Sequence, residues 1–226
     1  MLVDVHCHLN FDQFSSDRDE VIQRAKDANV VAIINSGTEY ETNIQTLELA
    51  KKYNIIKASL GIYPTYVQDL TEEDFQRDLK FIKEHKDEII AVGEVGLDYH
   101  HTTDQKLQKI QQDRFHTILE ELNKLNKPFV LHTRKAEKDV IDIVESKGIK
   151  KVDFHSFTGN YKLVKRIIDN GWCFSIPPNI IRMLHFQGLV GMAPLFQLLT
   201  ETDAPYLSPP PKQRNAAPCI FPNSTL

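Results

Sequence analysis

The fold of this chain is constrained most by a regular alternation of short apolar runs with charged segments of helical spacing. Eight apolar runs fit buried strands, and they span Leu2–Val5, Val30–Asn35, Ile55–Leu60, Ile89–Val92, Pro128–Leu131, Lys151–Phe154, Trp172–Ile176 and Leu195–Thr200. Helical segments lie between them, at Asp19–Ala28, Glu41–Tyr53, Glu72–Lys86, Gln105–Asn126, Lys138–Lys147 and Lys162–Asn170. A strand followed by a helix, repeated to eight strands, predicts a TIM-like (β/α)8 barrel of parallel strands.

The main alternative is an open, doubly wound parallel sheet, which also alternates strands and helices. No glycine-rich loop follows the first predicted strand, where a nucleotide-binding sheet has its phosphate-binding turn, so the barrel is favoured. With 226 residues, of which 41% are hydrophobic, the chain is long enough for one large core. We therefore expect a single domain over residues 1–226, with an irregular tail at 207–226.

Composition and charge restrict the class of binding partner and the location that we expect for the protein. A net charge of −4 argues against a protein that coats nucleic acid with a large basic surface, but it permits an enzyme that binds one phosphate. Segment 124–166 holds eleven Lys and Arg residues against five Asp and Glu; solvated helix faces explain most of them, although an anionic substrate would be attracted there. The start of the chain does not resemble a signal peptide, and no apolar run approaches the ~20 residues of a membrane span. We expect a soluble, cytoplasmic protein.

Six ionisable residues recur where apolar runs end, namely His6, His8, Glu94, His132, His155 and Asp203. His6 and His8 share one face of a strand because they are two residues apart. Each of the six alone has an ordinary explanation, such as a turn carboxylate or a histidine bonded to a carbonyl. Together they would meet at the C-terminal rim of a barrel, where barrel enzymes bind ligands. The three cysteines form no CxxC pair, so the set predicts a hydrolase whose two metals use histidine and carboxylate ligands.

Further ionisable residues lie near this predicted rim. Asp4 shares a strand face with the first histidine and either supports a ligand or caps the strand. His100 and His101 lie in the loop after the fourth strand, where one of them would reach a substrate. Arg134 follows the fifth strand and would bind a phosphate through two parallel hydrogen bonds, unless it forms a surface salt bridge.

Seven segments carry motifs of a known family, at 3–10 (VDVHCHLN), 61–64 (GIYP), 92–99 (VGEVGLDY), 128–134 (PFVLHTR), 154–159 (FHSFTG), 199–207 (LTETDAPYL) and 214–215 (RN). In their order and spacing, the chain resembles the TatD family of metal-dependent deoxyribonucleases, which belong to the amidohydrolase-like barrel hydrolases. The resemblance covers residues 1 to about 215.

The resemblance implies a site for two divalent ions, which would be Mg²⁺, Mn²⁺ or Zn²⁺. The six rim residues would be divided between the ions, with His6, His8 and Asp203 on one, His132 and His155 on the other, and Glu94 bridging. Asp203 would act as the general base on a water activated by both ions, and Glu94 would be the second catalytic residue. The implied activity is hydrolysis of DNA, proceeding from the 3′ end of a single strand.

The resemblance also implies substrate contacts and one structural difference. Tyr63 stands where the family often has histidine, so a phosphate contact there would come from a phenol. Arg214 and Asn215 match a family motif near the site. Because the family continues beyond this motif with further helices, we expect a shortened C-terminus that lacks the final helical layer. Apolar surface near strands eight and one would then be uncovered, which predicts a homo-oligomer or a partner at that face.

Two other functions stay open. A metal-dependent amide, ester or lactone hydrolase, or a deacylase of aminoacylated tRNA, would use the same ligands, and a barrel fold does not choose among these reactions. A non-catalytic remnant, disabled by the short C-terminus, is less consistent with a complete set of ligands. Arg134 and the basic segment 124–166 favour a phosphate substrate, and the resemblance favours DNA.

Overall fold

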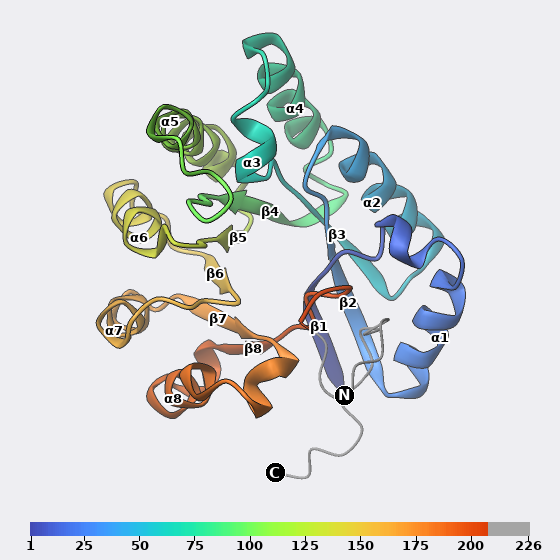
Figure 1. The fold of residues 1–226 in the computed structure, drawn as a ribbon. Helices are drawn as coiled ribbons and strands as arrows, with labels where there is room; N and C mark the ends of the chain where they lie inside the picture. Colours follow the sequence, from blue (N-terminus) through green and yellow to red (C-terminus); the bar gives the residue numbers. More distant parts are fainter. Residues whose placement is uncertain (208–226) are drawn as a thin grey trace.

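A computed structural model describes residues 1–207 of the protein. Eight strands form one sheet in chain order, and every neighbouring pair is parallel. They are β1 (Leu2–Cys7), β2 (Val30–Ser36), β3 (Ile56–Leu60), β4 (Ile89–Gly96), β5 (Phe129–His132), β6 (Val152–His155), β7 (Cys173–Ile176) and β8 (Leu198–Thr200). The sheet curls into a nearly closed barrel with the helices outside it (Figure 1). The predicted parallel barrel is confirmed.

Eight helices connect the strands, and 3-10 turns supplement them. The helices are α1 (Arg18–Asp27), α2 (Tyr40–Lys52), α3 (Pro64–Val67), α4 (Glu72–Glu84), α5 (Gln105–Leu122), α6 (Glu137–Ser146), α7 (Tyr161–Asp169) and α8 (Leu184–Met192). The 3-10 turns are η1 (Asp12–Phe14), η2 (Asn123–Leu125), η3 (Pro178–Ile181) and η4 (Leu195–Gln197). The six predicted helical segments match α1, α2 and α4 to α7, whereas α3 is a single turn and α8 lacks a polar face. Across residues 1–207, no helix combines the length and hydropathy needed to cross a membrane.

Most strands lie within two residues of their predicted bounds, and β8 and β4 differ by more. The expected strand Leu195–Thr200 begins as the turn η4, so β8 covers only its second half. The side chain of Gln197 anchors that turn, because its amide donates to the carbonyls of Ile168 at 3.2 Å and Trp172 at 2.7 Å. β4 is longer than expected and continues to Gly96. Glu94 therefore lies inside a strand.

The apolar core lies between the sheet and the surrounding helices. Phe154 of β6 and Phe174 of β7 are fully buried in one cluster with Phe115 of α5 and Phe186 of α8. Because neighbours along a strand point to opposite faces, a side chain next to Phe154 points away from this core. The alternation that packs Phe154 against the helices thus turns His155 toward the inside of the barrel.

Specific hydrogen bonds close the barrel between β1 and the segment after β8. The buried carboxylate of Asp4 accepts from the Thr202 backbone N–H at 3.0 Å and from the Thr202 hydroxyl at 2.6 Å. The Asp203 N–H donates to the carbonyl of His6 at 2.9 Å, and the His8 N–H donates to the carbonyl of Ala204 at 2.8 Å. Asp4 thus ties the two ends of the sheet together. This seam holds Asp203 beside His6 of β1 and His8, which follows that strand directly.

Apolar side chains are exposed near the same seam. Leu195 and Phe196 are 85% and 82% exposed, and Leu2 and Val3 are 40% and 39% exposed. Within residues 1–207, no helix follows β8. These exposures agree with the uncovered apolar surface that the sequence predicts. A second copy or a partner at this face stays a prediction, and residues 208–226 of the predicted tail lie outside the described part of the chain.

Candidate metal centre

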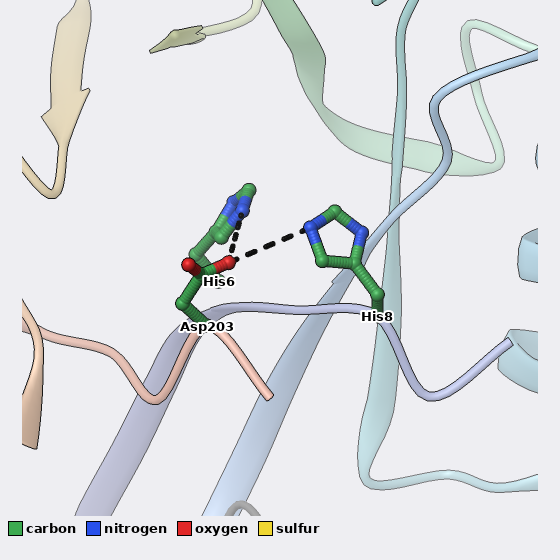
Figure 2. Close-up of side chains that lie close together, drawn as sticks. All are labelled: His6, His8 and Asp203. Carbon is green, nitrogen blue, oxygen red and sulfur yellow. Dashed lines mark ion pairs between the residues drawn. The ribbon is translucent and has the colours of Figure 1, made fainter. Parts of the chain in front are cut away.

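His6, His8 and Asp203 meet at the carboxyl end of the barrel strands. Figure 2 shows both imidazoles turned toward the Asp203 carboxylate, whose Oδ1 lies 3.6 Å from Nε2 of each ring. Asp203 has a φ of 53°, a left-handed conformation that aspartate tolerates better than most residues. His6 is fully buried, whereas the Asp203 side chain keeps 13% of its surface accessible. These three residues converge as the sequence predicts.

Glu94 lies between two pairs of histidines. Its Oε2 is 3.4 Å from Nε2 of His6 and from Nε2 of His8. Its Oε1 is 2.8 Å from Nδ1 of His132 and 3.3 Å from Nε2 of His155. Only 2% of the residue is exposed. Each carboxylate oxygen therefore faces a different pair of imidazoles.

Glycines let the backbones approach closely around Glu94. A Cβ atom on Gly61, at the end of β3, would lie 2.3 Å from both N and O of Glu94. A Cβ on Gly96 would lie 2.0 Å from the carbonyl oxygen of His132, and Gly96 has a φ of 145°. Only glycine fits at these two positions without a shift of the backbone. Gly61 thus lets the end of β3 lie close to Glu94, and Gly96 lets β4 lie close to His132 at the end of β5.

Ser36, the last residue of β2, orients His6 and His8. Nδ1 of His8 lies 2.9 Å from the Ser36 carbonyl oxygen. Because a carbonyl only accepts, His8 donates from Nδ1, and Nε2 is the nitrogen directed at Glu94 and Asp203. Nδ1 of His6 lies 3.1 Å from the Ser36 hydroxyl, and its Nε2 is buried without a hydrogen-bond partner among the described residues. An unpartnered buried nitrogen at this position fits a metal ligand.

Carboxylates orient the other two histidines. Nε2 of His132 lies 3.0 Å from Oδ2 of Asp98, and Nδ1 of His155 lies 3.3 Å from Oε2 of Glu201. Both carboxylates are buried. These contacts leave Nδ1 of His132 and Nε2 of His155 directed at Glu94.

Sequence reasoning missed Ser36, Asp98 and Glu201 as parts of this site. Ser36 is the last residue of β2, Asp98 follows β4, and Glu201 follows β8 directly. A polar residue at the carboxyl end of a barrel strand is the signal that could have found all three.

Burial and mutual contact set the charge state of the centre. Burial raises the pKa of Asp203 to about 6, even though His155 and His8 act in the opposite direction. Burial, reinforced by His155, lowers the pKa of His6 to about 3. Burial also opposes ionisation of Glu94, but the surrounding histidines together hold its pKa well below the usual range. Burial opposes protonation of His8, His132 and His155 as well, but the facing carboxylates raise the pKa of each ring, so a cation would bind by displacing protons from these three imidazoles.

The donor set fits divalent ions. Within the described residues, two groups of three could each hold an ion, with ligand atoms within 4.8 Å of one another: His6, His8 and Asp203, and His6, Glu94 and His155. His132 belongs to neither group, although its Nδ1 touches the same oxygen of Glu94 as His155. Nitrogen and oxygen donors without sulfur suit Mg²⁺, Mn²⁺ and Zn²⁺ to different degrees.

A cavity of about 600 Å³ opens onto the centre. Tyr63 and Arg134, two predicted substrate contacts, line it. The Tyr63 hydroxyl lies 3.2 Å from Nε2 of His132, and Arg134 is exposed. Phe11 and Tyr206, which the sequence did not single out, add an aromatic surface to the cavity beside His8 and Asp203.

The loop after β4 contributes His101 to the cavity wall. Nδ1 of His101 lies 2.7 Å from Oδ2 of Asp98, which holds the ring in place. His100, the other candidate contact in this loop, is exposed and is not among the residues that line the cavity. Arg214 and Asn215 lie outside the described residues. The substrate-binding roles of all these residues stay predictions.

A parallel barrel that gathers four histidines and two carboxylates at the carboxyl ends of its strands is characteristic of metal-dependent hydrolases. The family model described as TatD related DNase matches residues 3–225. The chain therefore belongs to the TatD family.

Individual relatives agree with this assignment. The human protein named Deoxyribonuclease TATDN3 is 36% identical over 228 residues, covering 95% of this chain and 81% of the relative. An uncharacterized metal-dependent hydrolase of Methanocaldococcus jannaschii is 37% identical over 207 residues, covering 92% of this chain and 80% of the relative. The crystal structure of YJJV, a TatD homologue from Escherichia coli, superimposes with a TM-score of 0.85 at 26% identity, covering 95% of this chain and 83% of that one. The chain is a metal-dependent hydrolase of this family.

Proposed function

We propose that this protein is a metal-dependent phosphodiesterase that removes nucleotides from the 3′ end of single-stranded DNA. The observation that carries the proposal is the position of Glu94, whose two oxygens face separate pairs of imidazole nitrogens at 2.8 to 3.4 Å. A carboxylate in this arrangement is suited to bridge two cations. The names of the relatives support DNA as the substrate.

Two divalent ions are proposed as cofactors, and Mg²⁺, Mn²⁺ or Zn²⁺ would suit the donors. His6, His8 and Asp203 would hold one ion, and His132 and His155 would hold the other, with Glu94 between them. Two such ions supply Lewis acidity, which activates water and neutralises charge on a phosphate.

Asp203 is the proposed general base. Its Oδ1 makes both contacts to the ring nitrogens of His6 and His8, so Oδ2 is the atom we expect to take up a proton. Burial raises the pKa of the metal-free carboxyl to about 6, so the group is mostly ionised at neutral pH and able to accept a proton. Asp203 also lines the cavity, where a substrate would reach it.

Arg134 is the proposed phosphate contact. Its guanidinium is exposed on the rim of the cavity and offers the planar pair of donors that matches two phosphate oxygens. Tyr63 and His101 line the same cavity and would donate further hydrogen bonds. Phe11 and Tyr206 offer aromatic surface for an unstacked base, as proteins that bind single strands commonly do. A cytoplasmic location stays a prediction.

The proposed activity is tested by nucleotide release from single-stranded DNA labelled at the 3′ end, with Mg²⁺ or Mn²⁺ present. We expect release by the intact protein and loss of release in Asp203→Asn and in excess chelator. Asp169→Asn, which changes an exposed carboxylate on α7 that pairs with Lys165, is the matched control and should retain full activity.

A label at the 5′ end tests the direction of cleavage, since trimming from the 3′ end leaves that label on a shortening ladder. Failure of the intact, metal-loaded protein to release nucleotides would overturn the proposal. Turnover of a carboxylic ester or of aminoacylated tRNA would then support the alternative hydrolases. Bound metal without turnover of any of these substrates would support a non-catalytic protein.

A further inference from the structure

The four histidines of the centre have two kinds of partner on the side away from Glu94. His6 and His8 both bond to Ser36, through its neutral hydroxyl and its neutral carbonyl. His132 and His155 each bond to a buried carboxylate instead. The two halves of the centre therefore differ in charge beyond the ligands themselves.

The buried carboxylates behind His132 and His155 compensate for a difference in ligand charge between the two halves of the centre. The half of the site with His6 and His8 has a carboxylate of its own, because Asp203 Oδ1 lies 3.6 Å from both rings. The half with His132 and His155 shares Glu94 but has no further carboxylate ligand among residues 1–207. A carboxylate that accepts a hydrogen bond from a ligating imidazole makes that ligand more basic and fixes its tautomer.

Several hydrogen bonds fix Asp98 in the position where it accepts a hydrogen bond from His132. Its Oδ1 accepts the backbone N–H groups of His100 at 2.9 Å and His101 at 2.8 Å. Its own N–H donates to the side chain of Gln111 at 2.9 Å. Oδ2 is left for the side chains of His101 at 2.7 Å and His132 at 3.0 Å. Asp98 is fully buried, so water does not weaken these bonds.

Glu201 occupies the equivalent place behind His155. It is 1% exposed and follows β8 directly, two residues before Asp203. Its Oε2 lies 3.3 Å from Nδ1 of His155, and its Oε1 has no hydrogen-bond partner in the described part of the chain. A buried carboxylate with so few partners is costly unless it stabilises a cation nearby.

Resting on the proposed two-ion site, we infer that Asp98 and Glu201 are positioning residues that retain the second ion through His132 and His155. They supply to that half of the centre the negative charge that Asp203 supplies directly to the other half. Removing either carboxylate should therefore lower the affinity for the second ion and leave the affinity for the first ion unchanged.

Asp98→Asn is the sharpest variant, because asparagine keeps the oxygen that accepts from the loop N–H groups. Its amide nitrogen would then face Nε2 of His132 and donate to it. His132 would carry its proton on Nδ1, the nitrogen directed at Glu94, and could no longer ligate from there. Glu201→Gln should weaken His155 as a ligand by removing the negative charge behind it.

The test is equilibrium dialysis of the full chain against Mn²⁺, with bound metal measured by atomic emission. We expect two ions in the wild type. In Asp98→Asn and in Glu201→Gln, the dissociation constant of one ion should rise about 10 to 100-fold while that of the other stays the same. Asp78→Asn, which changes a buried carboxylate on α4 that pairs with Arg77, should keep both ions.

A double variant identifies which ion is affected. Asp203→Asn should lower the affinity for the ion at His6 and His8. The double variant with Asp98→Asn and Asp203→Asn should therefore lower the affinity for both ions. A double variant that keeps one ion at wild-type affinity would overturn the inference, because Asp98 and Asp203 would then serve the same position. Unchanged affinity in folded single variants, or a single ion in the wild type, would also overturn it. Two bound ions without nuclease activity would count against the proposed function alone.

Discussion

Replacing Glu94 with glutamine should remove most of the stability that the protein gains from bound metal. Each oxygen of Glu94 faces two ring nitrogens, at distances from 2.8 to 3.4 Å. Glutamine is neutral, and one end of its amide carries hydrogens instead of a lone pair. One pair of histidines would therefore face a donor, and both halves of the centre would lose the shared charge.

The size of the effect follows from mass action. An ion present at 100 times its dissociation constant stabilises the folded state by about 2.7 kcal/mol. For a domain of about 150–250 residues, each kcal/mol moves the melting temperature by about 2–4 °C. One ion should thus raise the melting temperature by roughly 5–11 °C, and two ions by about twice as much.

Thermal melts in chelator and in saturating Mn²⁺ measure this gain for each variant. We expect the rise in Glu94→Gln to be less than half of the wild-type rise. Glu84→Gln is the matched control, because Glu84 is an exposed residue of α4 that pairs with Lys80, and it should show the full rise. Equal metal-dependent rises in the wild type and in Glu94→Gln would refute the placement of Glu94 between the ions.

Three further predictions concern pH, packing and substrate. Because burial raises the pKa of Asp203 to about 6, Mn²⁺ affinity should fall as the pH drops through 6 and the carboxylate takes up a proton; equal affinity at pH 5 and pH 7 in titrations would contradict this. Gly61→Ala would place a Cβ 2.3 Å from the Glu94 backbone and should cost about 1–3 kcal/mol in urea melts, whereas Gly191→Ala, where a Cβ meets nothing within 4 Å, should cost little. Arg134→Ala should weaken binding of single-stranded DNA and reduce the salt dependence of affinity by about one unit of slope in fluorescence anisotropy; an unchanged slope would exclude a phosphate contact.

The sequence by itself predicted the fold class and the six residues that the structure brings together at the centre. Strand and helix periods differ, so local hydrophobic patterning is sufficient to predict their alternation and hence a parallel barrel. The carboxyl ends of parallel strands meet at one rim, which is why His6, His132 and Asp203 could be grouped although they are far apart in the chain. The helix α8 was not predicted, because its residues lack the alternation of polar and apolar faces that indicates a surface helix.

Only the tertiary structure decided which atom of each ligand faces the centre. The choice between Nδ1 and Nε2 depends on what bonds to the other nitrogen, and that partner comes from a different strand or loop, as Ser36 does for His8 and Asp98 does for His132. The same dependence put His101, rather than His100, on the cavity wall, since the bond to Asp98 turns one ring of the loop inward. Spacing along a chain indicates which residues share a face of a strand. It carries no information on a hydrogen-bond partner that comes from a different strand or loop.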